Sequence, residues 1–371
     1  MASDGSDVVL FLEQLFDFYS QNMREVDLSE LFEVIRELGS GTFGSVLLVK
    51  DRKTARMMAL KMLDRSRTCQ SNFIREFSVS FFLSSHPNII GGYGLAFRFK
   101  NHYAFAQELS PIGDLHSLIP VNEGLPEAVV KRCAVQIASA LDFMKSKGLV
   151  HLDIKPENIL VFDRECALVK ITDFGLTQFK GQRISCKTGS KSYKSPELCQ
   201  ETSMEFLAAD PRIDVWAFGV VLFLLMTGMF PWEDATLEDR KYRRFVRWQQ
   251  ASPSKFTPYP WKKLPSALHS MFHSLLAVDI TVRGDATDVL ASLFWDFCSV
   301  YIPDGIHLQV LRVLCVEICK PLFLIFQDSF LSGIVPEDWR KADVVPIFKK
   351  GLKFVPGNYR PVSLTSVAGK V

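Results

Sequence analysis

The sequence predicts an α+β fold in which a small strand-rich part precedes a larger helical part. Apolar alternation from Glu33 to Lys50, and short apolar runs at 57–61, 89–95 and 103–108, indicate strands of a small antiparallel sheet. From Pro126 onward, apolar residues recur at steps of four and three, which is typical of one face of a long helix. These positions are Val130, Ala134, Ile137, Leu141 and Met144.

Length and composition narrow the class of protein. A chain of 371 residues can form two domains, or one two-lobed domain with an appendage. Its net charge of +2 argues against a nucleic-acid or membrane-surface partner. The eight cysteines are scattered without a CxxC pair, which is typical of a reduced, intracellular protein. We therefore expect a cytoplasmic location.

One uncharged stretch, Val215 to Trp232, is long enough to raise the possibility of a transmembrane helix. Asp214 precedes it, Gly228 and Pro231 end it, and no aromatic and basic flanks mark two membrane interfaces. A helix that is apolar on every face also suits the centre of a large folded domain. We favour the buried helix.

The first strands are joined by a glycine-rich hairpin, Gly39 to Gly44. Glycines allow backbone amides to approach an anion closely, although GxGxxG alone is weak evidence because dinucleotide-binding folds share the spacing. Here the glycines connect strand to strand and do not open a helix. The next strand presents Lys61 within an apolar run, so an anionic partner is expected, and Glu76 on the helix at 72–83 can supply it.

The stretch from His151 to Gly175 concentrates the chemistry. Asp153, Lys155 and Asn158 lie within one short turn, and two short apolar runs separate them from Asp173. Two strands joined by a turn would bring the carboxylates and the amide to one cleft. Oxygen ligands of this kind suit Mg²⁺ bound to phosphate, with a lysine charge beside it.

Two later segments carry alternative interpretations. Thr177 to Lys194 is polar and short of core-forming residues, so we expect a mobile loop over the site. Glu238 to Gln250 interleaves five basic residues with Tyr242, Phe245 and Trp248. Nucleic-acid binding is one interpretation of this pattern, but an amphipathic surface helix is favoured because the basic run is isolated.

Five motifs in order resemble those of eukaryotic protein kinases over about residues 30 to 300. They are GSGTFGSV, MALK, HLDIKPEN, DFG and SPE, followed by the helix motif DVWAFGV and by Arg283, which matches the arginine that the family pairs with Glu197. AQELSPIGDLHSLIP, FDREC and FVRWQ are similar to the SH3-domain-binding kinase family. The resemblance implies a bilobal fold with a β-rich N-lobe and a helical C-lobe.

The resemblance also implies roles for individual residues. Lys61 would hold the ATP phosphates and pair with Glu76, and Asp153 would act as the base beside Lys155. Asn158 and Asp173 would hold Mg²⁺, and Glu197 with Arg283 would form a buried pair. Adenine would meet backbone groups of Glu108 and Ser110. The complete set of implied nucleotide-binding positions is Leu38, Gly39, Ser40, Gly41, Thr42, Phe43, Gly44, Val46, Ala59, Lys61, Glu108, Ser110 and Asp114.

By this resemblance the chain is an ATP- and Mg²⁺-dependent kinase for protein serine and threonine hydroxyls, a pattern indicated by Lys155 and by Gly189-Ser190. A pseudokinase that binds nucleotide without transfer is the alternative, although the four residues that pseudokinases commonly lose are intact. The subfamily resemblance implies an SH3-domain partner, although the proline-rich tail of that subfamily is missing here.

One residue departs from the family pattern. Leu152 stands where an arginine usually precedes the catalytic aspartate and gathers a phosphate on the activation loop. We therefore expect activity that does not depend on phosphorylation of Thr177, Ser185 or Thr188.

Residues 301–371 do not continue the kinase pattern. GIVPEDWRKADVVPIFKKG and GNYRPVSLTS resemble the start of a non-LTR retrotransposon reverse transcriptase, but no paired metal-binding aspartates follow. We expect a truncated, poorly structured segment without partner strands. The expected organisation is a helical extension at 1–29, an N-lobe at 30–109, a C-lobe at 110–300 and this fragment at 301–371.

Overall fold

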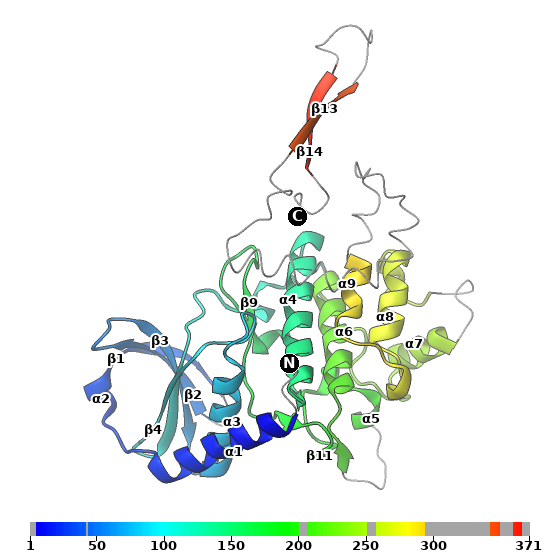
Figure 1. The fold of residues 1–371 in the computed structure, drawn as a ribbon. Coiled ribbons are helices and arrows are strands. Elements are labelled where there is room, and N and C mark those ends of the chain that lie inside the picture. The colour runs from blue at the N-terminus through cyan, green and yellow to red at the C-terminus, as the bar shows by residue number, and fades with distance from the viewer. Residues whose placement is uncertain are drawn as a thin grey trace. The chain divides into compact units, whose positions relative to one another are not determined.

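A five-stranded antiparallel sheet forms the amino-terminal part of the computed structural model, with strand order β1-β2-β3-β5-β4 (Figure 1). Its strands are β1 (Phe32–Ser40), β2 (Gly44–Asp51), β3 (Met57–Asp64), β4 (Gly92–Phe99) and β5 (His102–Gln107). The predicted strand at 89–95 is wrong in its bounds, because Ile89 forms only an isolated bridge to Ile171 and the regular strand begins at Gly92.

The structure describes residues 5–41, 44–199, 206–250, 257–293, 342–348 and 359–365. The chain divides into two units, Met1–Ala286 and Thr287–Val371. The first unit contains the sheet and the helices that bear the candidate site. The second contains the described helix α9 (Asp288–Leu293) and two strands.

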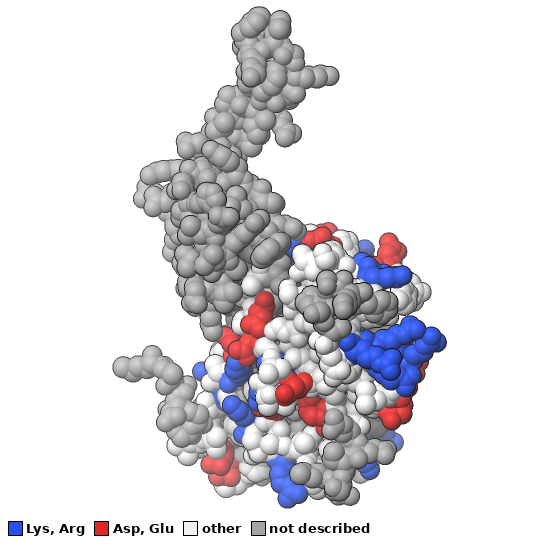
Figure 2. Space-filling model, turned by 90° about the vertical axis from the view of Figure 1, so that its right-hand side faces the viewer, with Lys and Arg blue, Asp and Glu red and all other residues white. Residues whose placement is uncertain are grey.

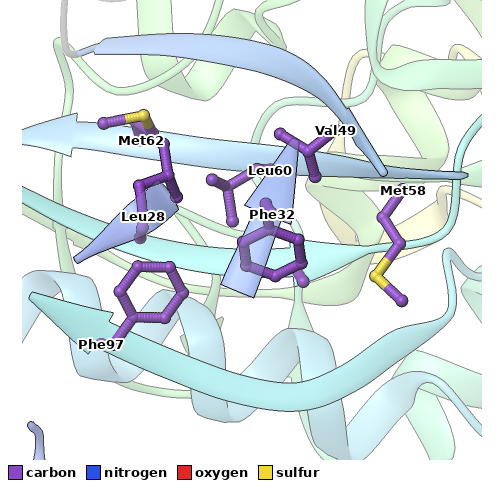
Figure 3. Packing of buried hydrophobic residues seen from close by; sticks show 9 residues of the cluster. Leu28, Phe32, Val49, Met58, Leu60, Met62 and Phe97 are labelled. Atoms are coloured by element: carbon purple, nitrogen blue, oxygen red, sulfur yellow. The ribbon is translucent and has the colours of Figure 1, made fainter. Parts of the chain in front are cut away.

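One face of the sheet is covered by the short helix α2 (Leu28–Leu31) and the start of β1. Leu28 and Phe32 pack on Leu60 and Met62 of β3 and on Phe97 of β4, and all five side chains are buried. Figure 3 shows these side chains converging between the strands and α2. This apolar layer makes β3 a rigid support for the residues it presents.

Helix α3 (Gln70–Leu83) covers the other face of the sheet, and helix α1 (Gly5–Asn22) packs on α3 (Figure 1). Phe73, Ile74 and Phe77 are buried against β5, and Phe16 and Tyr19 of α1 pack on the same cluster. Helix α1 lies within the helical extension expected at 1–29, and it ends at Asn22. Its apolar side chains dock on the sheet domain.

The helical part is built around α4 (Glu127–Ser146) and α6 (Pro211–Thr227), which pack on each other. All five residues of the predicted stripe on α4 are buried, and Gly148 ends the helix at φ +69°. Helix α6 is buried on nearly every face, with Asp210 capping its start and Gly228 its end at φ +64°. This confirms the buried-helix interpretation, and no described helix is long and apolar enough to cross a membrane.

Shorter elements complete this part. The helices are α5 (Pro196–Cys199), α7 (Arg240–Gln250) and α8 (His269–Leu275). The strands are β6 (Gly113–Asp114), β7 (Leu149–Val150), β8 (Ile159–Val161), β9 (Val169–Ile171), β10 (Gln178–Phe179), β11 (Arg183–Ser185) and β12 (Phe206–Ala208). The two strands predicted on either side of Asp163 are β8 and β9, which pair antiparallel. The small strand-rich part followed by a larger helical part confirms the predicted α+β class.

In the second unit, β13 (Ala342–Phe348) pairs antiparallel with β14 (Tyr359–Thr365) over seven residue pairs. The expectation that this segment lacks partner strands is wrong for these fourteen residues, because each strand is the other's partner. Most of the range 301–371 lies outside the described residues.

Candidate active site

Lys61 lies at the centre of an ionic cluster that joins the sheet to the helical part. Its Nζ is 2.5 Å from Glu76 Oε1 on α3 and 2.9 Å from Asp173 Oδ1. Burial alone would lower the pKa of Lys61, but the charges of Glu76 and Asp173 outweigh burial and raise it. Lys61 is therefore a permanent cation, held between two carboxylates at the place where β3 faces the DFG turn.

The glycine-rich hairpin lies directly beside this lysine. In the sheet register Val46 is opposite Gly39 on one side and Lys61 on the other. Gly44 passes so close to β3 that a Cβ would stand 1.8 Å from the carbonyl oxygen of Met62, so only glycine fits. The structure thus places Val46 next to Lys61, and Gly39 one strand further away. Thr42 and Phe43, which were predicted to bind nucleotide, lie outside the described residues.

The connection after β5 offers free backbone groups. Ala59 lies opposite Gln107 in the register, next to Glu108. The Glu108 carboxylate binds Lys170 Nζ at 2.9 and 2.7 Å. The backbone N–H of Glu108 donates to the carbonyl oxygen of Gly91, and the backbone carbonyl of Glu108 has no partner among the described residues. The Ser110 N–H is equally free there, while its hydroxyl donates to Val161 at 2.6 Å. The edge presents one acceptor and one donor, the pattern that adenine requires.

The remaining predicted nucleotide positions form the rim. Leu38 is 37% exposed, so its side chain remains available for contact. Asp114 accepts a hydrogen bond from Ser117 N at 2.9 Å, which fixes its carboxylate at the start of the helical part.

Asp153, in the catalytic loop (the HLDIKPEN motif at 151–158), accepts several side-chain hydrogen bonds. Its Oδ2 accepts from Lys155 Nζ at 2.6 Å and from Asn158 Nδ2 at 3.0 Å. Its Oδ1 accepts from the Ser190 hydroxyl at 2.8 Å, and Lys155 also donates to Ser190 at 2.9 Å. The predicted meeting of Asp153, Lys155 and Asn158 is present in the structure, and Ser190 demonstrates that Asp153 Oδ1 can hold a hydroxyl.

His151 supports this loop and received no role in the sequence analysis. Its Nδ1 accepts from Asp153 N at 3.3 Å, and its Nε2 lies 3.1 Å from the carbonyl oxygen of Thr172. Because one partner only donates and the other only accepts, the ring is neutral with its proton on Nε2. Burial lowers the pKa of His151, in agreement with the neutral form. His151 therefore links the catalytic loop to the segment that ends in Asp173.

Asp214, at the start of α6, holds the same loop from below. Its two carboxylate oxygens accept from His151 N at 2.6 Å and from Leu152 N at 2.8 Å. Leu152 has φ +70°, an unfavourable conformation for leucine that these hydrogen bonds help to fix. Burial raises the pKa of Asp214 to about 7, although the two N–H donors act in the opposite direction.

Asp173 and Asn158 supply the oxygen atoms expected of a magnesium site. Thr172 N donates to the backbone carbonyl of Asn158 at 2.9 Å, so Asn158, just before β8, lies beside the residues that follow β9. Burial would raise the pKa of Asp173, but Lys61 outweighs it, so the net pKa lies below the usual value and the carboxylate is ionised at neutral pH. The described residues contain no cluster of three His, Cys, Asp or Glu. The set therefore fits an ion that keeps waters and takes its other ligands from phosphate.

The segment expected to be a mobile loop, Thr177 to Lys194, is instead anchored at several points. Strand β10 pairs with β7, and β11 pairs with β12. Leu152 is 4% exposed and packs in an apolar cluster with Val150, Ile184, Leu198, Ala209 and Ile213. We call this set the Leu152 cluster. The polar sequence gave no sign of this strand pairing and apolar packing, because both depend on distant residues.

Glu197 and Arg283 form the predicted pair. Arg283 Nη1 and Nη2 lie 2.8 and 2.9 Å from the two carboxylate oxygens, and its side chain is fully buried. Its remaining donors bind the carbonyl oxygens of Ala277 and Arg212. The pair fixes the end of the segment that carries Ser190 against the helical core.

The comparisons with known proteins agree with this geometry. The protein kinase domain family matches residues 32–295. The chain is a serine/threonine protein kinase. The kinase is 44% identical over 282 residues to the zebrafish serine/threonine-protein kinase SBK1, covering 76% of this chain and 73% of the relative. It is 43% identical over 295 residues to mouse SBK1, covering 80% and 70%, and 39% identical to rat SBK2, covering 73% and 76%.

The kinase is therefore related to SBK1 and SBK2, and this relationship supports the predicted resemblance to the SH3-domain-binding kinase family. As a protein kinase domain it implies the use of ATP and Mg²⁺ and a protein substrate. The family match ends at residue 295, and nothing in these comparisons supports the reverse-transcriptase resemblance of residues 301–371, which stays a prediction.

Sequence reasoning missed His151, Asp214 and Lys170. The first two lie inside quoted motifs, so a signal was present, but their roles depend on contacts between residues about 20 and 60 positions apart. Lys170 alternates in strand β9 with two buried residues, and only the pairing of that strand reveals that it meets Glu108.

Proposed function

We propose that the kinase transfers the γ-phosphoryl group of Mg-ATP to serine or threonine hydroxyls with Asp153 as the catalytic base. One observation carries the proposal. Lys61, Glu76 and Asp173 form one continuous cluster, and Asp153, Lys155 and Asn158 form a second one, joined to the first through the bond from Thr172 to Asn158. Phosphoryl transfer depends on alignment and charge neutralisation, which these two clusters supply.

In this proposal Lys61 holds the α- and β-phosphates. Glu76 keeps the ammonium group in place, as its 2.5 Å contact to Nζ supports. The hairpin around Gly39 and Gly44 covers the phosphates, and the free carbonyl of Glu108 and N–H of Ser110 bind adenine. Asn158 and Asp173 would hold Mg²⁺, which neutralises phosphate charge when bound.

Asp153 orients the substrate hydroxyl and receives its proton. Ser190 already donates its hydroxyl hydrogen to Asp153 Oδ1 at 2.8 Å, so the substrate hydroxyl would take a comparable contact. Lys155 Nζ lies 2.6 Å from Asp153 Oδ2, where its positive charge can neutralise the transferred phosphoryl group. These residues are preorganised by His151 and Asp214, which act as positioning residues.

We further propose that this arrangement persists without phosphorylation of the 177–194 segment. The Leu152 cluster holds β11 through Ile184 and the end of the segment through Leu198. An apolar contact needs no phosphate to form, in contrast to an arginine that gathers one. None of the five cysteines among the described residues forms a disulfide, which supports the proposed reducing, cytoplasmic location. The SH3-domain partner stays a prediction.

Two measurements on the full chain and on Asp153→Asn test the proposal. Calorimetric titration reports Mg-ATP binding, and transfer of radiolabelled phosphate to a serine peptide reports catalysis. We expect both proteins to bind Mg-ATP, and only the full chain to transfer. Binding without transfer by the full chain would identify a pseudokinase, and transfer by Asp153→Asn at an undiminished rate would exclude Asp153 as the base.

A further inference from the structure

Helix α7 exposes a strongly basic surface that the phosphoryl-transfer site does not use. Five of its eleven residues are cations and none is acidic. All five side chains are exposed, and we call them the basic face: Arg240, Lys241, Arg243, Arg244 and Arg247. Figure 2 faces the side of the molecule on which Figure 1 places α7, and it contains one large continuous group of Lys and Arg side chains.

Most charges of the basic face lie in electrostatically unfavourable positions. Arg240 and Lys241 occupy the first turn, where the helix dipole disfavours cations. Arg240 and Arg244, and Arg243 and Arg247, are four residues apart, so like charges repel along the helix. Among the described residues none of the five makes an ion pair, and the side chain of Arg243 donates only to the carbonyl oxygen of Leu237. The helix dipole favours only Arg247, which lies in the last turn, and the other four cations gain no such support; this points to a partner that supplies the missing negative charge.

The exposed surface selects the chemistry of that partner. The aromatic residues Tyr242, Phe245 and Trp248 are buried in the core, where Phe245 and Trp248 pack on Trp261. They are unavailable for stacking on bases or for insertion into a membrane, and no large apolar side chain of α7 is exposed. The basic face therefore offers a partner positive charge only, and the negative charge of carboxylates on a polypeptide complements it.

Short contacts tie the basic face to the catalytic loop. Asp239 accepts from Lys241 N and Tyr242 N at the start of α7, and its other oxygen accepts from Glu233 N at 2.8 Å. The neighbouring Asp234 pairs with Lys191 at 2.9 Å. Lys191 follows Ser190, whose hydroxyl binds Asp153. The basic face is thus fixed relative to the place where the acceptor hydroxyl would bind.

We propose that the basic face of α7 binds acidic side chains of the protein substrate, so that the kinase prefers acceptors with a run of Glu or Asp some residues away from the serine. This inference rests on the proposed transfer activity and specifies its substrate class. Exposed ion pairs are individually weak, but several cations on one rigid helix, about 16 Å long, raise the local concentration of an acidic segment.

The test compares synthetic peptides that carry one serine and a short run of glutamates, with matched glutamine peptides as references. The run begins about 4, 8 or 12 residues from the serine on either side, a reach of roughly 14 to 43 Å for an extended chain. We expect the best glutamate peptide to exceed its glutamine match about fivefold in kcat/KM, through KM, with the preference falling as salt rises.

Arg244→Gln/Arg247→Gln should abolish this preference while phosphorylating the glutamine peptides at the full rate. The matched control Lys50→Gln/Lys53→Gln removes two cations from the sheet domain and should retain the preference. Equal use of both peptide sets by the full chain would overturn the inference, as would a preference that survives in the α7 variant. Loss of transfer to every peptide would instead refute the proposed function.

A third comparison separates other polyanions. Phosphatidylserine vesicles and a single-stranded oligonucleotide are titrated against the full chain and the α7 variant by sedimentation. If either binds through α7 while the peptides are not distinguished, the basic face serves a membrane or a nucleic acid and the inference is wrong.

Discussion

Two clusters flank the same catalytic loop, and they differ in kind. The Lys61 cluster is ionic, with one ammonium group between the carboxylates of Glu76 and Asp173. The Leu152 cluster is apolar, although Leu152 stands where the kinase motif pattern described in the sequence analysis has an arginine. In the proposed mechanism charge serves the site that meets the phosphates, and apolar packing serves the element that needs only to stay in place.

The largest expected effect comes from breaking the ionic cluster. Lys61→Met leaves Glu76 and Asp173 facing each other without their shared cation, and the phosphates lose their fixed positive charge. We expect kcat/KM for ATP to fall about 10²- to 10³-fold, the loss typical of one preorganised charge-stabilising group. Lys131→Met removes a half-buried lysine that pairs with Glu127 on α4 and should leave the rate unchanged. Equal effects of the two variants would refute the special role of Lys61.

Breaking the apolar cluster should reduce stability more directly than chemistry. Leu152→Ala removes a buried side chain packed on Ile184 and Leu198, at a cost of about 2–5 kcal/mol in the free energy of unfolding. Chemical denaturation measures this loss. Leu10→Ala, at an exposed leucine of α1, is the matched control and should change stability by less than about 0.5 kcal/mol. A Leu152 variant as stable as its control would contradict the packing role.

The sequence predicted more of the ionic cluster than of the apolar one, for a physical reason. The sequence predicts the pairing of Lys61 with Glu76 because a charge within an apolar run needs a partner. It predicts the apolar stripe on α4 because the spacing of the residues is helical. For Leu152 the sequence showed only that the usual arginine is missing, and it gave no indication of the apolar packing. Its neighbours Ile184 and Ala209 come from segments that fold together only in three dimensions, and the polar sequence of 177–194 concealed the pairing of β10 and β11.

The pH dependence of stability should report on His151, which lies between the two clusters in the catalytic loop. Burial lowers the pKa of His151, so the unfolded chain binds a proton near its usual pKa of about 6.5 while the folded chain resists it. The contribution of His151 to stability is complete above about pH 6.5 and is lost as pH falls below it, by up to about 1.4 kcal/mol per pH unit. Denaturation of the full chain and of His151→Asn between pH 7 and 5 measures this slope. Parallel curves for the two proteins would contradict the neutral, buried imidazole.

The smallest effect is expected at the candidate phosphorylation sites. Thr177→Ala/Ser185→Ala/Thr188→Ala should change the transfer rate by no more than about twofold, because packing of Leu152 and Ile184 persists in the variant. Thr177 is in addition only 2% exposed. Ser190→Ala is the contrasting variant, and its rate should fall because Asp153 and Lys155 lose their shared partner. A large loss in the triple variant would show that a phosphate, rather than the Leu152 cluster, organises the segment.

One measurement tests the central claim most directly: the single-turnover rate of phosphoryl transfer from Mg-ATP to a serine peptide by the full chain after phosphatase treatment. We expect the treated and untreated proteins to react equally fast, and at least about a hundredfold faster than Asp153→Asn. A treated protein as slow as Asp153→Asn would contradict the account, because the site would then depend on a phosphate that the Leu152 cluster is proposed to replace.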